Sequence, residues 1–98
     1  MGEREERGLE EASTMKYKIL LETRARREFL DLPDKVRRRI QEGIDDLATN
    51  PRPPGVKKLA GIDGYRLRRG DYRILFTIND GTKEIRIYRI GHRRDIYR

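Results

Sequence analysis

Arginines at alternate positions in the last third of the chain are the residues best placed to do chemistry. Arg66 and Arg68 lie on one candidate strand, and Arg73 lies on the next. Because successive side chains of a strand point to opposite faces, Arg66 and Arg68 project from the same side of a sheet. Guanidinium groups held in this way form a rigid positive surface that suits phosphate. The pattern favours RNA as the ligand.

Composition predicts a single small domain that binds polyanions. The chain has 98 residues, of which 42% are charged and 35% are apolar, and its net charge is +7. Residues 1–14 hold five Glu and two Arg, which leaves 22 basic and 12 acidic side chains, a net +10, in residues 15–98. Such an excess attracts polyanions. The sequence has no cysteine and one histidine, so we expect no disulfide, no metal site and no cofactor.

The N-terminal stretch differs from the rest of the chain. Residues 1–14 are acidic and polar without apolar periodicity, so we expect a disordered extension, followed by one folded domain over residues 15–98. The extension lacks the apolar centre of a signal peptide. No run approaches the roughly 18 apolar residues that a membrane span needs. We therefore expect a cytoplasmic protein that does not enter membranes.

Two helices are expected between residues 23 and 49. Thr23 is a candidate N-cap of the first helix, and Pro33 suits the first turn of the second. Gly43, inside the second helix, is tolerable if the two helices cross closely there. The apolar stripe of the first helix comprises Ala25, Phe29 and Leu32, and that of the second comprises Val36, Ile40, Ile44 and Leu47.

Four strands are expected, over residues 17–22, 65–69, 72–79 and 84–90. Asp80-Gly81 is a strong turn signal between the last two. In the last strand Ile85 and Ile87 share a face that Tyr88 and Ile90 do not both fit, which a bulge or partial cover on both faces would reconcile. The predicted fold is α+β, in the order β-α-α-β-β-β, with a helical hairpin packed on one face of a mostly antiparallel four-stranded sheet.

Three short motifs follow one another along the chain. They are Lys58-Leu59 with Gly61, then Tyr65-Arg66-Leu67-Arg68 followed by Tyr72-Arg73, and finally Gly91-His92-Arg93-Arg94-Asp95-Ile96-Tyr97. Together with the order of elements, they resemble the RelE-type toxins of the RelE/ParE toxin–antitoxin superfamily. The resemblance covers residues 15–98. That superfamily contains both ribosome-dependent mRNA endonucleases and gyrase inhibitors.

The resemblance to the nuclease branch implies a metal-independent endoribonuclease that inhibits translation, in which a 2′-hydroxyl of the RNA attacks the adjacent phosphate. The functional positions that it implies here are Arg66, Arg68, Arg73, Arg93 and Tyr97. The best-known member has lysines in place of Arg66 and Arg68, and its spacing between the last two positions is longer. The implied partners are the ribosome with its mRNA and a cognate protein antitoxin, in a toxin–antitoxin heterotetramer.

Cyclising cleavage of RNA requires removal of the 2′ proton, stabilisation of a charged phosphorane and protonation of the leaving 5′ oxygen. Arginine performs only the second of these, because a guanidinium stays protonated. His92 is the natural candidate for proton transfer, since histidine is the side chain that titrates near neutrality. A lone histidine is also often structural. Tyr97 either takes part, by stacking or by donating a proton, or anchors the tail.

Other basic residues are candidates for binding RNA or the ribosome, and for each the alternative is a solvated charge. These candidates are Lys57, Lys58, Arg69 and Arg94. Arg86 and Arg89 are expected to be solvated charges on an exposed strand.

Three functions compete. A ribosome-dependent mRNA endonuclease is favoured, because gyrase binding would not require an arginine cluster joined to a His-Arg-Arg tail. A non-enzymatic ParE-type gyrase inhibitor is the alternative from a different class. An RNA-binding module with degenerate catalytic residues is the third, because arginine replaces lysine twice.

Overall fold

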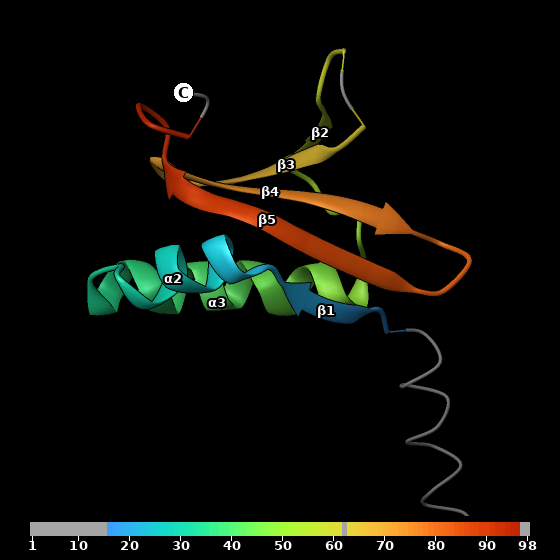
Figure 1. The fold of residues 1–98 in the computed structure, drawn as a ribbon, viewed down its shortest axis with the longest axis horizontal. Coiled ribbons are helices and arrows are strands. Elements are labelled where there is room, and N and C mark those ends of the chain that lie inside the picture. The colour runs from blue at the N-terminus through green and yellow to red at the C-terminus, as the bar shows by residue number, and fades with distance from the viewer. Residues whose placement is uncertain (1–15, 62, 97–98) are drawn as a thin grey trace, which may run out of the picture.

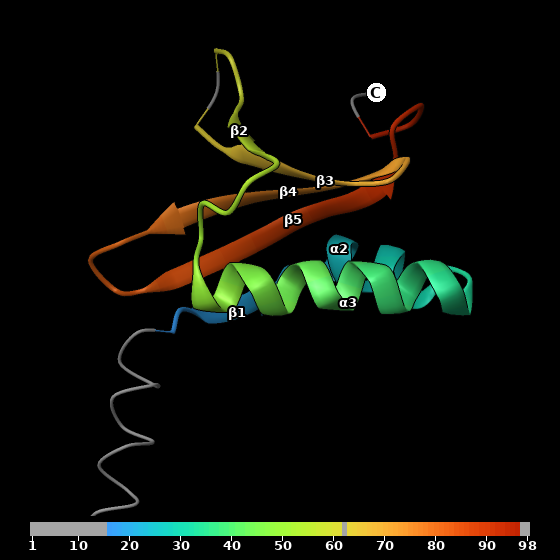
Figure 2. The ribbon, with the colours of Figure 1, turned by 180° about the vertical axis from the view of Figure 1, so that it is seen from behind.

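The computed structural model describes residues 16–61 and 63–96, and in this part of the chain two helices lie against one face of a sheet (Figures 1 and 2). The elements are β1 (Lys18–Leu21), α2 (Thr23–Leu30), α3 (Asp34–Thr49), β2 (Val56–Lys58), β3 (Tyr65–Arg69), β4 (Tyr72–Asn79) and β5 (Glu84–His92). The predicted α+β class, with a helical hairpin on one face of the sheet, is confirmed.

Within the described residues the sheet has five strands in the order β1-β5-β4-β3-β2, with β1 parallel to β5 and the other neighbours antiparallel. The prediction of four strands was wrong, because β2 lies in a stretch predicted to be a loop. Two of its three residues are lysines, and it follows a segment rich in Pro and Gly, so it carries no local strand signal. β2 forms by pairing with β3, where Val56 lies opposite Leu67.

The core lies between the helices and the sheet, and the predicted apolar stripes of both helices are confirmed. The helices contribute buried Ala25, Ile40, Ile44 and Leu47, with Phe29 and Val36 packed at the edge of the core. Leu32, predicted on the stripe of the first helix, packs there from the connection after α2, which ends at Leu30. The sheet contributes Leu67, Ile74, Phe76, Ile85, Ile87 and Ile90. Full burial of a large apolar side chain contributes about 1.5–3 kcal/mol. This layer therefore holds the sheet on the helices.

The ends of the helices differ slightly from expectation. Glu22 is the N-cap residue of α2, so the capping role predicted for Thr23 is wrong. Pro33 likewise is the N-cap residue of α3 and does not lie in its first turn. The last carbonyl groups of a helix have no partner within the helix. At the end of α2, the carbonyl oxygen of Leu30 accepts a hydrogen bond from Nη1 of Arg37 at 3.2 Å. Neither helix is long and apolar enough to cross a membrane, as far as the described residues go.

A bulge in β5 resolves the irregular phase of that strand. Leu75 of β4 lies opposite Arg89, and Phe76 lies opposite Ile87, so Tyr88 is the extra residue of a bulge on β5. The bulge returns Ile90 to the core face, which confirms the predicted reconciliation.

Gly43 of α3 makes room for the sheet, so the close crossing of the helices that the sequence offered as one reason for this glycine does not explain it. A Cβ at Gly43 would lie 3.3 Å from side-chain atoms of Arg69 and Ile74. Arg69 therefore lies flat across the helix, and its Nη2 donates to Asp46 at 2.7 Å. The small residue lets an arginine from β3 reach an acid on α3.

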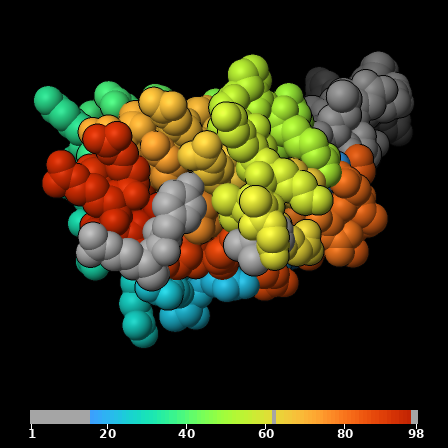
Figure 3. Space-filling view, turned by 90° about the horizontal axis from the view of Figure 1, so that it is seen from above, coloured from blue at the N-terminus to red at the C-terminus, as the bar shows by residue number. Residues whose placement is uncertain are grey.

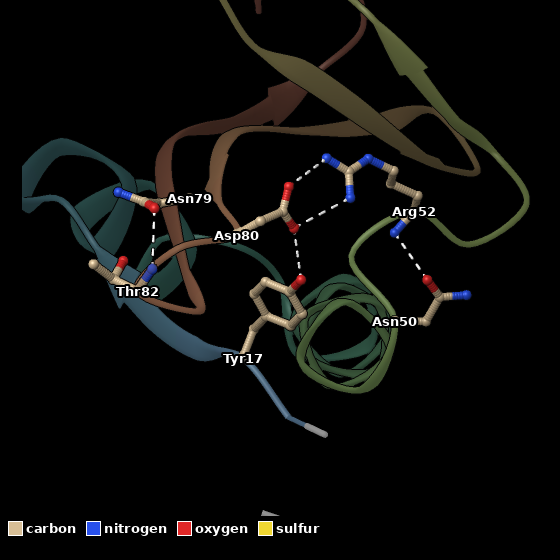
Figure 4. A network of polar contacts seen from close by, with 6 residues as sticks. All are labelled: Tyr17, Asn50, Arg52, Asn79, Asp80 and Thr82. Atoms are coloured by element: carbon tan, nitrogen blue, oxygen red, sulfur yellow. Dashed lines mark hydrogen bonds and ion pairs between the residues drawn. The ribbon is translucent and has the colours of Figure 1, made fainter. Parts of the chain in front are cut away.

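A polar network ties the start of β1 to the β4–β5 turn and to the loop after α3 (Figure 4). The hydroxyl of Tyr17 donates to Asp80 at 2.6 Å, and Arg52 donates to the same carboxylate at 3.1 Å. The Arg52 guanidinium also lies over the ring of Tyr65, 5.5 Å from its centroid. Hydrogen bonds from Arg52, and then from Tyr17, lower the pKa of Asp80. The bond to Asp80 raises the pKa of Tyr17.

Candidate nucleic-acid interface

The face of the sheet turned away from the helices carries two rows of side chains that run across the strands. Residues opposite one another in antiparallel strands project from the same face, and neighbouring strands are about 4.8 Å apart. The first row comprises Lys57, Arg66, Leu75 and Arg89, from β2, β3, β4 and β5 in turn, and the second comprises Arg68, Arg73 and Gly91. We call Arg66, Arg68 and Arg73 the arginine cluster. It unites three side chains that the sequence predicted to share a face.

Like charges lie directly opposite one another in this arrangement. Lys57 pairs with Arg66, and Arg68 pairs with Arg73. Such cross-strand pairs destabilise a sheet. In the described part of the chain neither Arg66 nor Arg68 has an acidic partner. A bound anion would relieve the repulsion, so the face suits phosphate.

Arg73 is the buried member of the cluster. Its exposure is 8%, and its Nη1 donates to the carbonyl oxygens of Gly70 and Tyr72, both at 3.0 Å. Its Nε is buried without a hydrogen-bond partner among the described residues. Buried charges are usually paired with an opposite charge. Arg73 instead has only neutral carbonyl partners in the described structure, which leaves its charge available to an anion.

Residues Arg93–Ile96 form a turn after β5, which we call the closing turn. The backbone N–H of Arg93 donates to the carbonyl oxygen of Asp71 at 2.7 Å, and its Nε lies 3.8 Å from the Asp71 carboxylate. The side chain of Ile96 is buried, and its Cδ1 lies 3.3 Å from where a Cβ on Gly91 would be. Seen from above the sheet, the closing turn lies at one end of the molecule, and the β2–β3 connection lies nearer the middle (Figure 3).

Comparison with known proteins identifies the family. Residues 19–97 match the family model of the ParE toxin of type II toxin-antitoxin systems. The chain belongs to the RelE/ParE toxin superfamily. It is 36% identical to toxin RelG of Mycobacterium tuberculosis over 88 residues, which cover 86% of this chain and 99% of RelG. The resemblance to RelE-type toxins is therefore confirmed, and the chain is a RelE-type toxin of a toxin–antitoxin system.

Solved structures agree with this assignment. A chain of the toxin–antitoxin complex RelBE2 from Mycobacterium tuberculosis matches with a TM-score of 0.71 at 30% identity, over 79% of this chain and 98% of that one. A chain of the archaeal RelE–RelB complex from Pyrococcus horikoshii matches with a TM-score of 0.72 at 32% identity, over 83% of this chain and 99% of that one. The fold of this RelE/ParE toxin is thus that of its relatives.

His92 lies on the other face of the sheet from the arginine cluster. It is opposite Tyr72 in the register, and the two rings meet edge to face with centroids 5.3 Å apart. Its Nδ1 accepts a hydrogen bond from the backbone N–H of Arg94 at 3.1 Å, which assigns the proton of the neutral ring to Nε2. His92 therefore organises the closing turn at the rim of the sheet of this RelE/ParE toxin.

The other candidates divide between the two faces. Lys57 shares the face of the arginine cluster, whereas Lys58 lies opposite Tyr65 and projects to the other side. Arg69 also lies on the helix side, paired with Asp46, so the structure sets it apart from the cluster. Arg94 is exposed on the closing turn. Tyr97 lies outside the described residues.

Sequence reasoning missed the role of Arg89. It was expected to be a solvated charge, but its side chain is only 14% exposed and its Nε lies 3.0 Å from Glu28 of α2. The signal that could have revealed this was the interrupted alternation of apolar residues in β5. The bulge at Tyr88 interrupts it and turns Arg89 to the face of the arginine cluster. The partner on a helix 61 positions away had no signal in the sequence.

Proposed function

We propose that this toxin is a ribosome-dependent endoribonuclease that cleaves mRNA by attack of a 2′-hydroxyl on the adjacent phosphate. The observation that carries the proposal is the arginine cluster, with two members that have no acidic partner among the described residues and a third that is buried with an unpaired Nε. A cleaved phosphate gains negative charge in the transition state, and preorganised donors stabilise that charge. Inhibition of translation follows from loss of the message.

In this proposal the arginines and the closing turn have separate tasks. Arg66, Arg68 and Arg73 orient the phosphate and stabilise the phosphorane, and Arg93 contributes from the closing turn. Guanidinium groups cannot transfer protons at neutral pH, so another group must carry them. We propose Tyr97 for this role, and His92, which projects from the other face, would act only from the rim of the sheet where the closing turn begins. The products would end in a 2′,3′-cyclic phosphate or the 3′-phosphate that its hydrolysis gives.

We propose an acidic antitoxin as the inhibitory partner. The matched toxin structures from Mycobacterium tuberculosis and Pyrococcus horikoshii are complexes with an antitoxin. Residues 15–98 of this chain carry a net charge of +10, which attracts a partner of opposite charge. A small protein with an acidic amphipathic segment fits that surface best.

The second candidate function is inhibition of DNA gyrase. It is favoured by one observation, that the matching family model is described as a ParE toxin. Gyrase binding would not require an arginine cluster on the sheet.

The deciding experiment is translation in vitro with purified toxin, followed by primer-extension mapping of the mRNA. We expect cuts in ribosome-bound mRNA that are absent from free mRNA, and Arg73→Met should abolish most of them. Arg38→Ala is the matched control, because Arg38 is exposed on α3, away from the sheet. Intact mRNA together with loss of DNA supercoiling by gyrase would replace the nuclease proposal with the second function.

A further inference from the structure

Glu28 on α2 is joined to the closing turn through Arg89 on β5. Its carboxylate accepts one hydrogen bond from the backbone N–H of Ile90 at 2.8 Å and another from Nε of Arg89 at 3.0 Å. Arg89 in turn donates from Nη1 to the carbonyl oxygen of Ile96 at 3.3 Å. A chain of hydrogen bonds thus runs from the helical layer to the turn that follows β5.

The position of Glu28 follows from where β1 ends. β1 pairs with β5 as far as Leu21, which lies opposite Ile87. Beyond that point the outer edge of β5 needs acceptors for its backbone N–H groups. Glu28 supplies one to Ile90, and this fixes the carboxylate beside Arg89. The Glu28 and Arg89 side chains are only 23% and 14% exposed, so their charge-assisted bond is screened less than a surface ion pair.

The bond from Arg89 holds the far end of the closing turn. The carbonyl oxygen of Ile96 is held by Arg89, while its side chain packs against Gly91. Gly91 lies directly opposite Arg73 of the arginine cluster. The turn also carries Arg93, which we assign to the phosphate. Loss of the Arg89 bond would therefore loosen the turn at Ile96 and leave Arg93 to its contacts with Asp71, so that its position relative to Arg73 is less fixed.

We propose that Glu28 is a positioning residue that, acting through Arg89, holds the closing turn in place beside the arginine cluster. For its effect on cleavage this inference rests on the proposed nuclease function. The holding of the turn is independent of that function, and the two are measured separately.

Hydrogen exchange measures the holding of the turn. The backbone N–H groups of Asp95 and Ile96 both donate to the carbonyl oxygen of His92 and report on the order of the turn. In Glu28→Gln and in Arg89→Lys we expect these amides to exchange about tenfold faster, because a charge-assisted bond is lost. Amides of the central strand β4 should stay protected. Unchanged exchange at Asp95 and Ile96 in both variants would overturn the proposal.

The matched control is the exposed pair of Arg86 and Glu22, which lie 4.0 Å apart with side chains 51% and 44% exposed. Glu22→Gln and Arg86→Lys should leave exchange in the turn unchanged. Arg89→Lys leaves Glu28 free to accept from Ile90, so it serves as the test should Glu28→Gln fail to fold.

Single-turnover cleavage of ribosome-bound mRNA measures the consequence for catalysis. We expect both variants to slow cleavage roughly 10- to 100-fold with ribosome affinity within about twofold of wild type, because misplacement of a group reduces rate more than binding. The double variant should be no slower than the slower single variant, since both act on one path. Faster exchange with unchanged cleavage would overturn the positioning role. If wild-type toxin does not cleave, the nuclease proposal fails, and exchange still decides whether Glu28 holds the turn.

Discussion

Substitution of Arg73 should affect stability and cleavage in different ways, because the side chain is 8% exposed and its buried Nε lacks a hydrogen-bond partner in the described structure. Arg73→Met keeps most of the volume and removes the charge. We expect a melting temperature at least as high as that of wild type, since a buried charge without a carboxylate is unfavourable. Cleavage should slow by roughly 10²–10³-fold, as for loss of a donor to a developing anion. Circular dichroism and single-turnover cleavage measure the two effects.

The comparison variant for Arg73 is Arg66→Met, on the same face but less buried. It should slow cleavage without a gain in stability. A melting temperature several degrees below wild type for Arg73→Met would show that Arg73 mainly supports the β3–β4 turn.

His92 is tested by asparagine and not by a larger amide. The Oδ1 of Asn takes the place of Nδ1 and can accept the hydrogen bond from Arg94, but it carries no proton at neutral pH. If His92 transfers a proton, His92→Asn should slow cleavage by roughly 10²–10⁴-fold with an unchanged melting temperature. His92→Ala removes the acceptor as well and should also lower the melting temperature. Wild-type cleavage by His92→Asn would limit His92 to its place in the closing turn.

The network of Tyr17, Arg52 and Asp80 joins three connections and makes stability depend on pH. The pKa of Asp80 is below its ordinary value of 3.8 because of Arg52 first and Tyr17 second. A carboxyl with a lowered pKa stabilises the fold above its unfolded pKa, and that stabilisation is lost as pH falls below about 4. The melting temperature of wild type should therefore fall more steeply than that of Asp80→Asn between about pH 5 and pH 3.

The alkaline side of the dependence of melting temperature on pH provides a second test of that network. The pKa of Tyr17 is raised above 10.0 by its bond to Asp80, so its contribution is present at neutral pH and is lost at alkaline pH. Tyr17→Phe should flatten the alkaline limb and leave most of the acid limb, because Arg52 still contacts Asp80. Parallel acid limbs in wild type and Asp80→Asn would contradict the assignment.

Periodicity was enough to predict the helices, four of the five described strands and the irregular phase of β5, for which a bulge was one of two explanations, because each depends on the spacing of apolar residues such as Ile85, Ile87 and Ile90. It could not predict β2, since a strand with two lysines forms only when β3 offers an edge. The alternation of side chains along the strands correctly placed Arg66, Arg68 and Arg73 on one face of the sheet. The remaining contacts of the candidate site join distant elements, and spacing along one element carries no information about them.

The charge of the whole molecule governs its association with polyanions. Residues 1–14 carry a net −3 and residues 15–98 a net +10, and the first of these ranges lies outside the described residues. We predict that deleting residues 1–14 leaves the melting temperature nearly unchanged and tightens binding to ribosomes at low salt, because it removes negative charge. Binding titrations at several salt concentrations measure this.

Lys57→Ala is the counterpart of that deletion, since it removes positive charge from the face of the arginine cluster. It should weaken binding and reduce the slope of log affinity against log salt by about one. A truncated protein that melts several degrees lower, or loses activity, would show that residues 1–14 contact the domain.

The parallel pairing of β1 with β5 also sets the order of events during synthesis. β1 emerges early from the ribosome, yet its neighbour in the sheet is β5, where Lys18 lies beside Glu84. β5 also lies between β1 and β4, so a nascent chain that lacks β5 cannot form a continuous sheet. Pairing between strands so far apart in the chain is slow. We therefore expect the tertiary structure to form after translation of β5, and a chain interrupted within that strand to lack both the β1–β5 pairing and the closing turn that carries Arg93.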